Sequence, residues 1–246
     1  TVVILTIFLF LTMGGISESS TVAIIIFIIH LTVIALLIGS VIFYIANNGL
    51  EIAKLNFHAP LKGSIATALF LGFSTAMLGV TGFETSANFV EEQKPGVFPK
   101  TLRNMWILVF VINPVIALLA VSLMTLNEVV SHQDALLFHM GLQTGGSWLA
   151  TIVSLDAALV LSGAVLTAFI GVTGLIRRMT LDRIFPQALL KENKRGSSPA
   201  ILIVFYLLCL SILFITNGEL GPLAGVYTIS FLSVMAFFGL GNLLLK

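Results

Sequence analysis

Long apolar stretches separated by short polar connectors run through the whole chain. Seven such stretches can be recognised: Thr1–Met13, Val22–Ala46, Ile65–Val90, Met105–Leu126, Trp148–Ile176, Pro199–Thr216 and Pro222–Leu245. Most of them contain the roughly 20 residues that an α-helix needs to cross a hydrocarbon core of about 30 Å. The first is too short to span unless it continues upstream. The pattern therefore predicts an all-α membrane protein with about seven transmembrane helices.

The composition agrees with the pattern. Hydrophobic residues make up 58% of the chain and charged residues 9%, and the mean hydropathy is +1.10. A soluble domain carries about 25% charged residues, so this chain has too little polar surface to cover a globule in water. The chain begins and ends inside or directly beside an apolar stretch, which leads us to expect an internal piece of one transmembrane domain that occupies residues 1–246.

The third stretch is interrupted near its middle. Gly79 and Gly82 break the apolar run, and the ionisable Glu84 follows at once. A backbone that leaves the helix inside lipid has N–H and C=O groups that hydrocarbon cannot satisfy, so such breaks persist only where they face a cavity or a bound solute. The segment is therefore predicted to be a discontinuous helix that forms part of a substrate site. The residues expected to line this site are Gly79, Val80, Thr81, Gly82 and Phe83.

The distribution of lysine and arginine predicts the orientation in the membrane. Ten of the twelve lie in alternate connectors, chiefly residues 91–104 and 177–198, whereas the opposite side has only Lys54 and Lys62. Because basic connectors remain in the cytoplasm, residues 91–104 and 177–198 are predicted to be cytoplasmic. The connector from Leu126 to Ser147 is then external, and residues 129–140 are expected to form a short amphipathic helix.

Three short motifs carry a resemblance to a known family. They are Gly82-Phe83-Glu84 with the acidic pair Glu91-Glu92 and Pro99 after it, the run GVTGLIRRMTLDRIFP from Gly171 to Pro186, and GGISES from Gly14 to Ser19. In this order and spacing the chain resembles the amino acid–polyamine–organocation permeases. The resemblance implies helices four to ten of a LeuT-like fold built from two inverted repeats. The second repeat would occupy residues 64–246, and the first would be incomplete.

Two ionisable residues are candidates for proton coupling. Glu84 falls at the break, where the first turn of the following half-helix would stabilise a carboxylate, and it either titrates beside the substrate or only caps that half-helix. By resemblance, His30 stands where proton-coupled members have a lysine that substitutes for a sodium ion. An imidazole, whose unperturbed pKa is about 6.5, could do similar work, or it could be a neutral hydrogen-bonding group between helices.

Asp156 and a polar cluster at the cytoplasmic side complete the candidate residues. Asp156 either lines an outer vestibule and selects a cationic group or forms a structural pair. Arginines after the fifth stretch could form an inner gate with acidic residues, or they could be topology determinants in contact with lipid headgroups. The residues of this predicted gate are Glu91, Glu92, Arg177, Arg178 and Asp182.

These observations favour a secondary active transporter of amino acids or related amines that works by alternating access around the break at Gly79–Glu84. A proton is favoured over sodium as the coupling ion, and no cofactor, metal or nucleic acid is expected. An enzyme is disfavoured because the zinc motif HExxH and the nucleophile motif GxSxG are absent from the sequence. A sensor that does not transport, or a partner subunit on the same scaffold, remains the alternative function.

Overall fold

A computed structural model of the chain describes residues 1–15, 20–60, 63–76, 79, 82 and 93–244. Within these ranges the regular secondary structure is entirely helical. The elements are α1 (Val2–Met13), α2 (Ser20–Asn48), α3 (Glu51–Phe57), α4 (Ile65–Ala76), α6 (Val97–Leu123), α7 (Leu126–Ser131), η3 (Gln133–Ala135), α8 (Leu136–Gly145), α9 (Ser147–Leu181), η4 (Gln187–Leu190), α10 (Pro199–Ile215) and α11 (Leu220–Leu244). The prediction of an all-α protein is confirmed.

Four helices are long and apolar enough to cross a membrane. They comprise residues Thr21–Asn48, Val97–Leu123, Ser147–Leu181 and Leu220–Gly241. The other apolar helices, α1, α4 and α10, have between 10 and 17 residues. Seven apolar helices therefore stand where the sequence predicts seven apolar stretches, and four of them reach a spanning length within the described residues.

Two helices extend further than their apolar stretches. Helix α6 begins at Val97, eight residues before the predicted start at Met105. Pro99 lies in its first turn, where a missing backbone N–H breaks no helical hydrogen bond. Helix α9 continues to Leu181, so Arg177 and Arg178 lie in its last turns, where the helix dipole stabilises positive charge. The apolar pattern underestimates both helices because it stops at the first charged residue.

The external connector differs from its prediction. The single amphipathic helix expected over residues 129–140 is replaced by three short helices, α7, η3 and α8. Thr125 begins α7 with a capping box, in which its hydroxyl accepts from the Glu128 amide and Glu128 accepts from the Thr125 amide. The Thr125 amide and hydroxyl both donate to the Glu128 carboxylate, and these two hydrogen bonds lower the pKa of this carboxyl, which is exposed in the connector.

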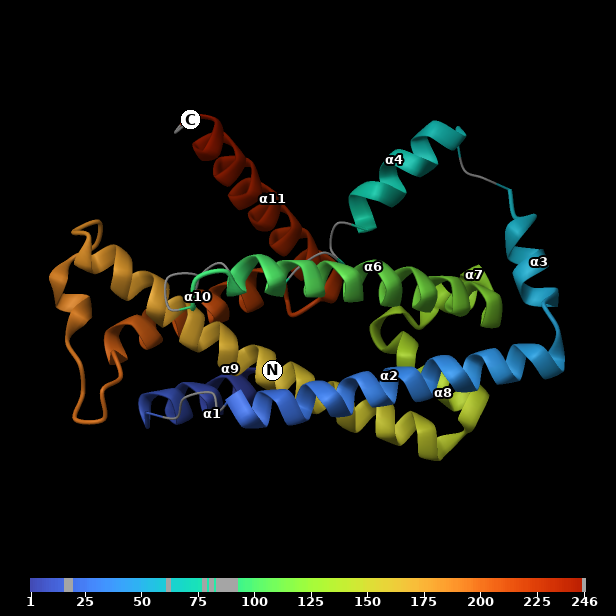
Figure 1. Ribbon diagram of the computed structural model, residues 1–246, viewed down its shortest axis with the longest axis horizontal. Coiled ribbons are helices and arrows are strands. Elements are labelled where there is room, and N and C mark those ends of the chain that lie inside the picture. Colours follow the sequence, from blue (N-terminus) through green and yellow to red (C-terminus); the bar gives the residue numbers. More distant parts are fainter. Residues whose placement is uncertain (16–19, 61–62, 77–78, 80–81, 83–92, 245–246) are drawn as a thin grey trace.

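Helices α2 and α9 cross each other and share the main core (Figure 1). Val33, Leu37 and Val41 form a buried stripe on α2 at intervals of four residues, which places them on one helix face. Leu149 and Val153 of α9 pack against this stripe, together with residues of α6 and α8. The same two faces hold the candidate site described below.

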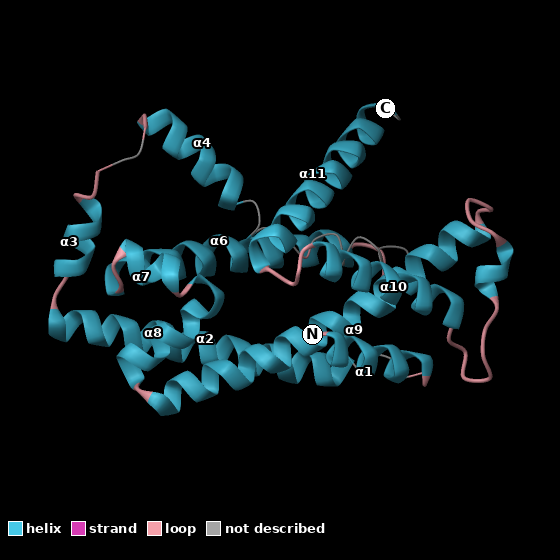
Figure 2. Cartoon of the chain, turned by 180° about the vertical axis from the view of Figure 1, so that it is seen from behind, coloured by secondary structure: helices cyan, strands magenta, loops and turns pink. Residues whose placement is uncertain are grey.

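A second, smaller core lies at the other end of α9, between α1, α9 and α10. Phe169 of α9 is fully buried there against Leu9 of α1 and Leu202 of α10. Its ring packs edge-on against the ring of Phe205, with the two ring centroids 5.0 Å apart. Helices α4 and α11 project away from the rest of the bundle in both views (Figures 1 and 2). Helix α9 is thus the element that joins the two cores.

Candidate functional site

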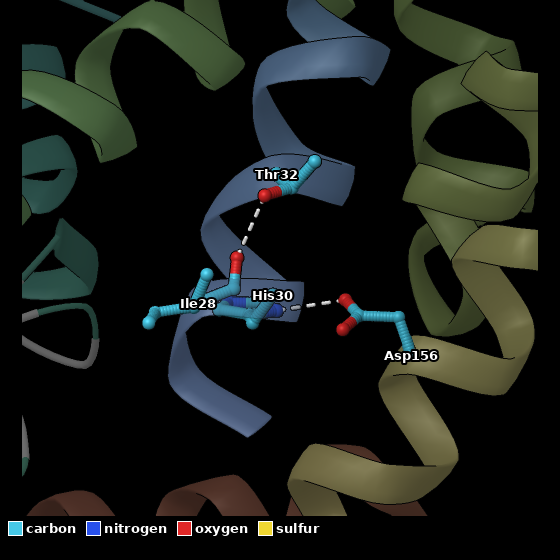
Figure 3. A network of polar contacts seen from close by, with 4 residues as sticks. All are labelled: Ile28, His30, Thr32 and Asp156. Carbon is cyan, nitrogen blue, oxygen red and sulfur yellow. Dashed lines mark hydrogen bonds and ion pairs between the residues drawn. The ribbon is translucent and has the colours of Figure 1, made fainter. Parts of the chain in front are cut away.

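The faces that build the main core also bring together His30 and Asp156. His30 precedes Val33 by three residues on α2, and Asp156 follows Val153 by three residues on α9. Residues three or four apart share one face of a helix, so both side chains extend the packed stripes of the α2–α9 contact. Figure 3 shows the imidazole and the carboxylate pointing toward one another from the two helices. The sequence predicts roles for each residue, and the structure makes them a pair.

The contact between the two side chains is short. Nδ1 of His30 lies 2.7 Å from Oδ2 of Asp156, a distance typical of a hydrogen bond with a charged partner. The Asp156 residue is 5% exposed, whereas the His30 side chain is 35% exposed. The carboxylate is therefore almost completely removed from solvent, and the imidazole is its link to the surroundings.

The second carboxylate oxygen has no such contact. Oδ1 of Asp156 is buried and has no hydrogen-bond partner among the described residues. Burying a carboxylate oxygen without a hydrogen-bond partner costs free energy, because the hydrogen bonds to water are lost and no protein donor replaces them. This oxygen can consequently accept a hydrogen bond from a cationic group that enters the neighbouring space.

A cavity of about 650 Å³ opens beside this pair, between α2, η3, α8 and α9. Two carboxylates, Asp134 and Asp156, and one imidazole, His30, line it; the other lining residues are mostly apolar, such as Val33 and Leu137. Asp134 is exposed and Asp156 is buried, so the two acidic groups lie in different environments. Among the described residues that line the cavity there is no lysine or arginine.

Few residues around the predicted break are described. Ala76 is the last residue described in α4, and Gly82 has a φ of 104°, a conformation outside the right-handed helical region that favours glycine. The Asn113 side chain of α6 donates to the Gly79 carbonyl at 2.9 Å, and a Cβ at position 79 would lie only 2.8 Å from that donor. The predicted site residues Val80, Thr81 and Phe83, and the proton-coupling candidate Glu84, lie outside the described residues.

The predicted inner gate has a different partner for one arginine. Arg177 pairs with Glu192 of the following connector, with Nη1 and Oε1 2.7 Å apart, instead of with Asp182. Asp182 follows the last residue of α9, and its amide donates to the Arg178 carbonyl. The other two members, Glu91 and Glu92, lie outside the described residues.

Sequence reasoning missed Asn113 and Glu192 as contact residues. Asn113 precedes Pro114 in an apolar helix, and the sequence alone suggests only a kink there. A polar amide in the middle of an apolar stretch was the available signal, because such a group needs a partner inside the membrane. Glu192 gives no signal of this kind, since it is one of several charged residues in an exposed connector.

Long apolar helices with a buried ionisable pair between two of them define the chain as a polytopic α-helical membrane protein with a polar site inside its bundle. The chain belongs to the amino acid permease family, whose sequence profile matches residues 1–246. No curated protein and no solved structure matches the chain significantly. Membership confirms the resemblance read from the three motifs: the chain is an integral membrane protein of a transporter class, not an enzyme, and amino acids are the substrates that the family implies.

Proposed function

We propose that the chain forms part of a proton-linked secondary transporter that moves an amino acid or a related amine by alternating access. The observation that carries the proton link is the His30–Asp156 pair, with its Nδ1–Oδ2 distance of 2.7 Å and its buried carboxylate. Ionisable residues inside a membrane protein are expensive to bury and are functional by default. The class of protein follows from the family, and the proposed coupling ion is supported by this pair.

The pair offers a simple way to couple a proton to movement. With one proton shared between His30 and Asp156, the contact holds α2 against α9 at the level of the cavity. Adding a second proton neutralises the carboxylate, and removing the shared proton leaves a neutral imidazole beside it; in either case the attraction between opposite charges is lost and only a hydrogen bond remains. A proton can shift the equilibrium between two conformations only if it binds one of them more tightly than the other. The His30–Asp156 pair meets this condition if α2 and α9 separate in one conformation, because the proton is then shared in the other conformation alone.

The substrate part of the proposal rests on the broken segment. The backbone of Gly79–Phe83 would bind the amino group of the substrate through carbonyl oxygens, which are the acceptors that a discontinuous helix offers. Support comes from Gly82, whose positive φ of 104° is not that of a right-handed helix. The Asn113 amide uses one lone pair of the Gly79 carbonyl, and a carbonyl oxygen has a second one that a substrate ammonium could use. Glu84 would be a further proton site beside the substrate.

The predicted gate residues fit the same scheme on the cytoplasmic side. The Arg177–Glu192 contact joins the end of α9 to the connector that leads to α10, and both side chains remain partly exposed to solvent. An exposed ion pair contributes little to stability, so it can form and break in each transport cycle at small cost. We assign Glu91, Glu92, Arg178 and Asp182 to this gate together with Arg177.

Uptake by the full-length parent protein tests the proposal. The purified protein is reconstituted into liposomes, and accumulation of radiolabelled amino acids is followed with and without an inward proton gradient. We expect accumulation above equilibrium only with the gradient, and its collapse when a protonophore is added. Binding of an amino acid without any flux would contradict transport and would favour the sensor function. Accumulation driven by a sodium gradient at equal pH would contradict the proton link alone.

A further inference from the structure

A second cavity lies at the opposite end of α9 from the external connector, between α1, α9 and the connector before α10. Its volume is about 510 Å³. Three arginines line it, Arg177, Arg178 and Arg195, and the first of them pairs with Glu192 of the connector. Among the described residues that line the cavity there is no aspartate or glutamate. The cavity is at the end of the bundle that the basic connectors assign to the cytoplasm.

Hydrogen bonds hold the connector against the end of α1 and set the position of Arg195. The side chains of Asn193 and Ser197 both donate hydrogen bonds to the Met13 carbonyl, each at 2.9 Å. The Asn193 side-chain oxygen accepts in turn from the backbone amides of Arg195 and Ser197, at 2.9 and 3.1 Å. The position of the Arg195 backbone is therefore set by a closed network and does not depend on a ligand.

Two glycines allow the connector to approach so closely. A Cβ on Gly15 would lie 3.0 Å from the Arg195 carbonyl oxygen, and one on Gly14 would lie 3.5 Å from its Nη1 atom. Arg195 consequently lies against the end of α1, and it is one of the residues that line the cavity. No carboxylate lies within ion-pair distance of Arg195 in the part of the chain that the structure describes.

The other walls of the cavity narrow the class of ligand. The hydroxyls of Thr173 and Ser197 already donate to carbonyl oxygens, and Arg177 already pairs with Glu192, so the proposed recognition of an anion rests on Arg195. Phe169, Ile170 and Leu202 form an apolar wall of the same cavity. A planar, permanently charged guanidinium recognises phosphate with two hydrogen bonds at once, and an apolar wall next to it suits a lipid chain better than a soluble ion.

We propose that this cavity binds the phosphate group of an anionic phospholipid from the cytoplasmic leaflet. Basic pockets between transmembrane helices on that side are suited to lipid headgroups, because the leaflet is rich in negative charge. The lipid would link α1, α9 and the connector before α10, which are the three elements that surround the cavity. The site is separate from the His30–Asp156 pair and does not depend on the transport proposal.

Native mass spectrometry of the purified full chain tests the lipid site. Dioleoyl phosphatidylglycerol is titrated onto delipidated protein, and dioleoyl phosphatidylcholine and inorganic phosphate are titrated in parallel. We expect phosphatidylglycerol to bind at least about tenfold more tightly than phosphatidylcholine, because charge-assisted hydrogen bonds favour the anionic headgroup. Inorganic phosphate that binds as tightly as phosphatidylglycerol does would overturn the lipid assignment in favour of a soluble anion.

Two neighbouring substitutions separate a site from general surface charge. Arg195→Gln should weaken phosphatidylglycerol binding about tenfold, whereas Lys194→Gln, which removes an equal charge one residue away, should change it less than about twofold. Arg195→Lys keeps the charge without the fork and should restore only part of the affinity. Equal losses in the Arg195→Gln and Lys194→Gln proteins would overturn the proposal, provided that both elute as monodisperse proteins. Unchanged affinity in Arg195→Gln would overturn it as well.

Discussion

Asp156→Asn should abolish amino acid accumulation driven by a proton gradient, with a fall of at least about tenfold in initial uptake rate, while substrate exchange across the membrane continues. An asparagine fills the same space and can still hydrogen-bond to a neutral His30, so the α2–α9 contact persists. It cannot carry the negative charge that makes the pair a proton site. A purely structural role for Asp156 predicts nearly normal uptake in this variant.

The measurement compares gradient-driven uptake with counterflow in proteoliposomes made from equal amounts of protein. Asp134→Asn is the matched control, because Asp134 lines the same cavity but is exposed and has no contact with His30. The control should retain most of its gradient-driven uptake. Normal accumulation in Asp156→Asn, or an equal loss in both variants, would remove Asp156 from the coupling mechanism.

Gly82→Ala should reduce uptake about tenfold or more without preventing insertion into the membrane. The φ of Gly82 is 104°, and an L-residue with a side chain reaches such a conformation only at a cost of about 1–3 kcal/mol. A Cβ there would also lie 3.4 Å from the Met105 side chain on α6, which is ordinary contact, so the backbone conformation and not crowding is the source of the effect. The strain should push the segment toward a regular helix and remove the binding backbone.

Gly72→Ala provides the comparison for this prediction. Gly72 lies inside α4, and a Cβ at this position would meet no atom within 4 Å. Alanine favours a helix by about 1 kcal/mol over glycine in such a position, so uptake should be unchanged or slightly increased. Uptake at the normal rate by Gly82→Ala would show that the left-handed glycine is not required for transport.

The class of fold could be predicted because it depends on long apolar stretches and on three short motifs. Inside lipid every backbone N–H and C=O group needs a hydrogen-bond partner within the protein, so an apolar stretch of this length is expected to form an α-helix. The helix ends were harder to predict, because the apolar pattern ends before the helix does. Lys100 and Arg177 are both helical, although each lies outside its apolar stretch.

The pairing of His30 with Asp156 could not be predicted for a different reason. In a soluble helix the apolar stripe marks the packed face, but α2 and α9 are apolar around most of their circumference. The sequence therefore identifies both residues without indicating which faces meet. The stripe of Val33, Leu37 and Val41 becomes recognisable only after the packing is known. Arg177 and Glu192 illustrate the same limit for exposed charges, since several partners satisfy the same spacing.

Substrate protection of a cysteine at position 81 tests the central claim most directly, namely that an amino acid binds to uncoiled backbone between Gly79 and Phe83. Thr81→Cys is introduced into a full-length parent without other cysteines, with Cys209 replaced by serine, and is labelled with a water-soluble maleimide. We expect labelling that slows at least about tenfold when the transported amino acid is saturating, because a bound solute fills the space beside the backbone. Val130→Cys, on the exposed side of α7 in the external connector, should be labelled without such protection. A cysteine at position 81 that reacts at the same rate with and without substrate, or that never reacts, would contradict the account.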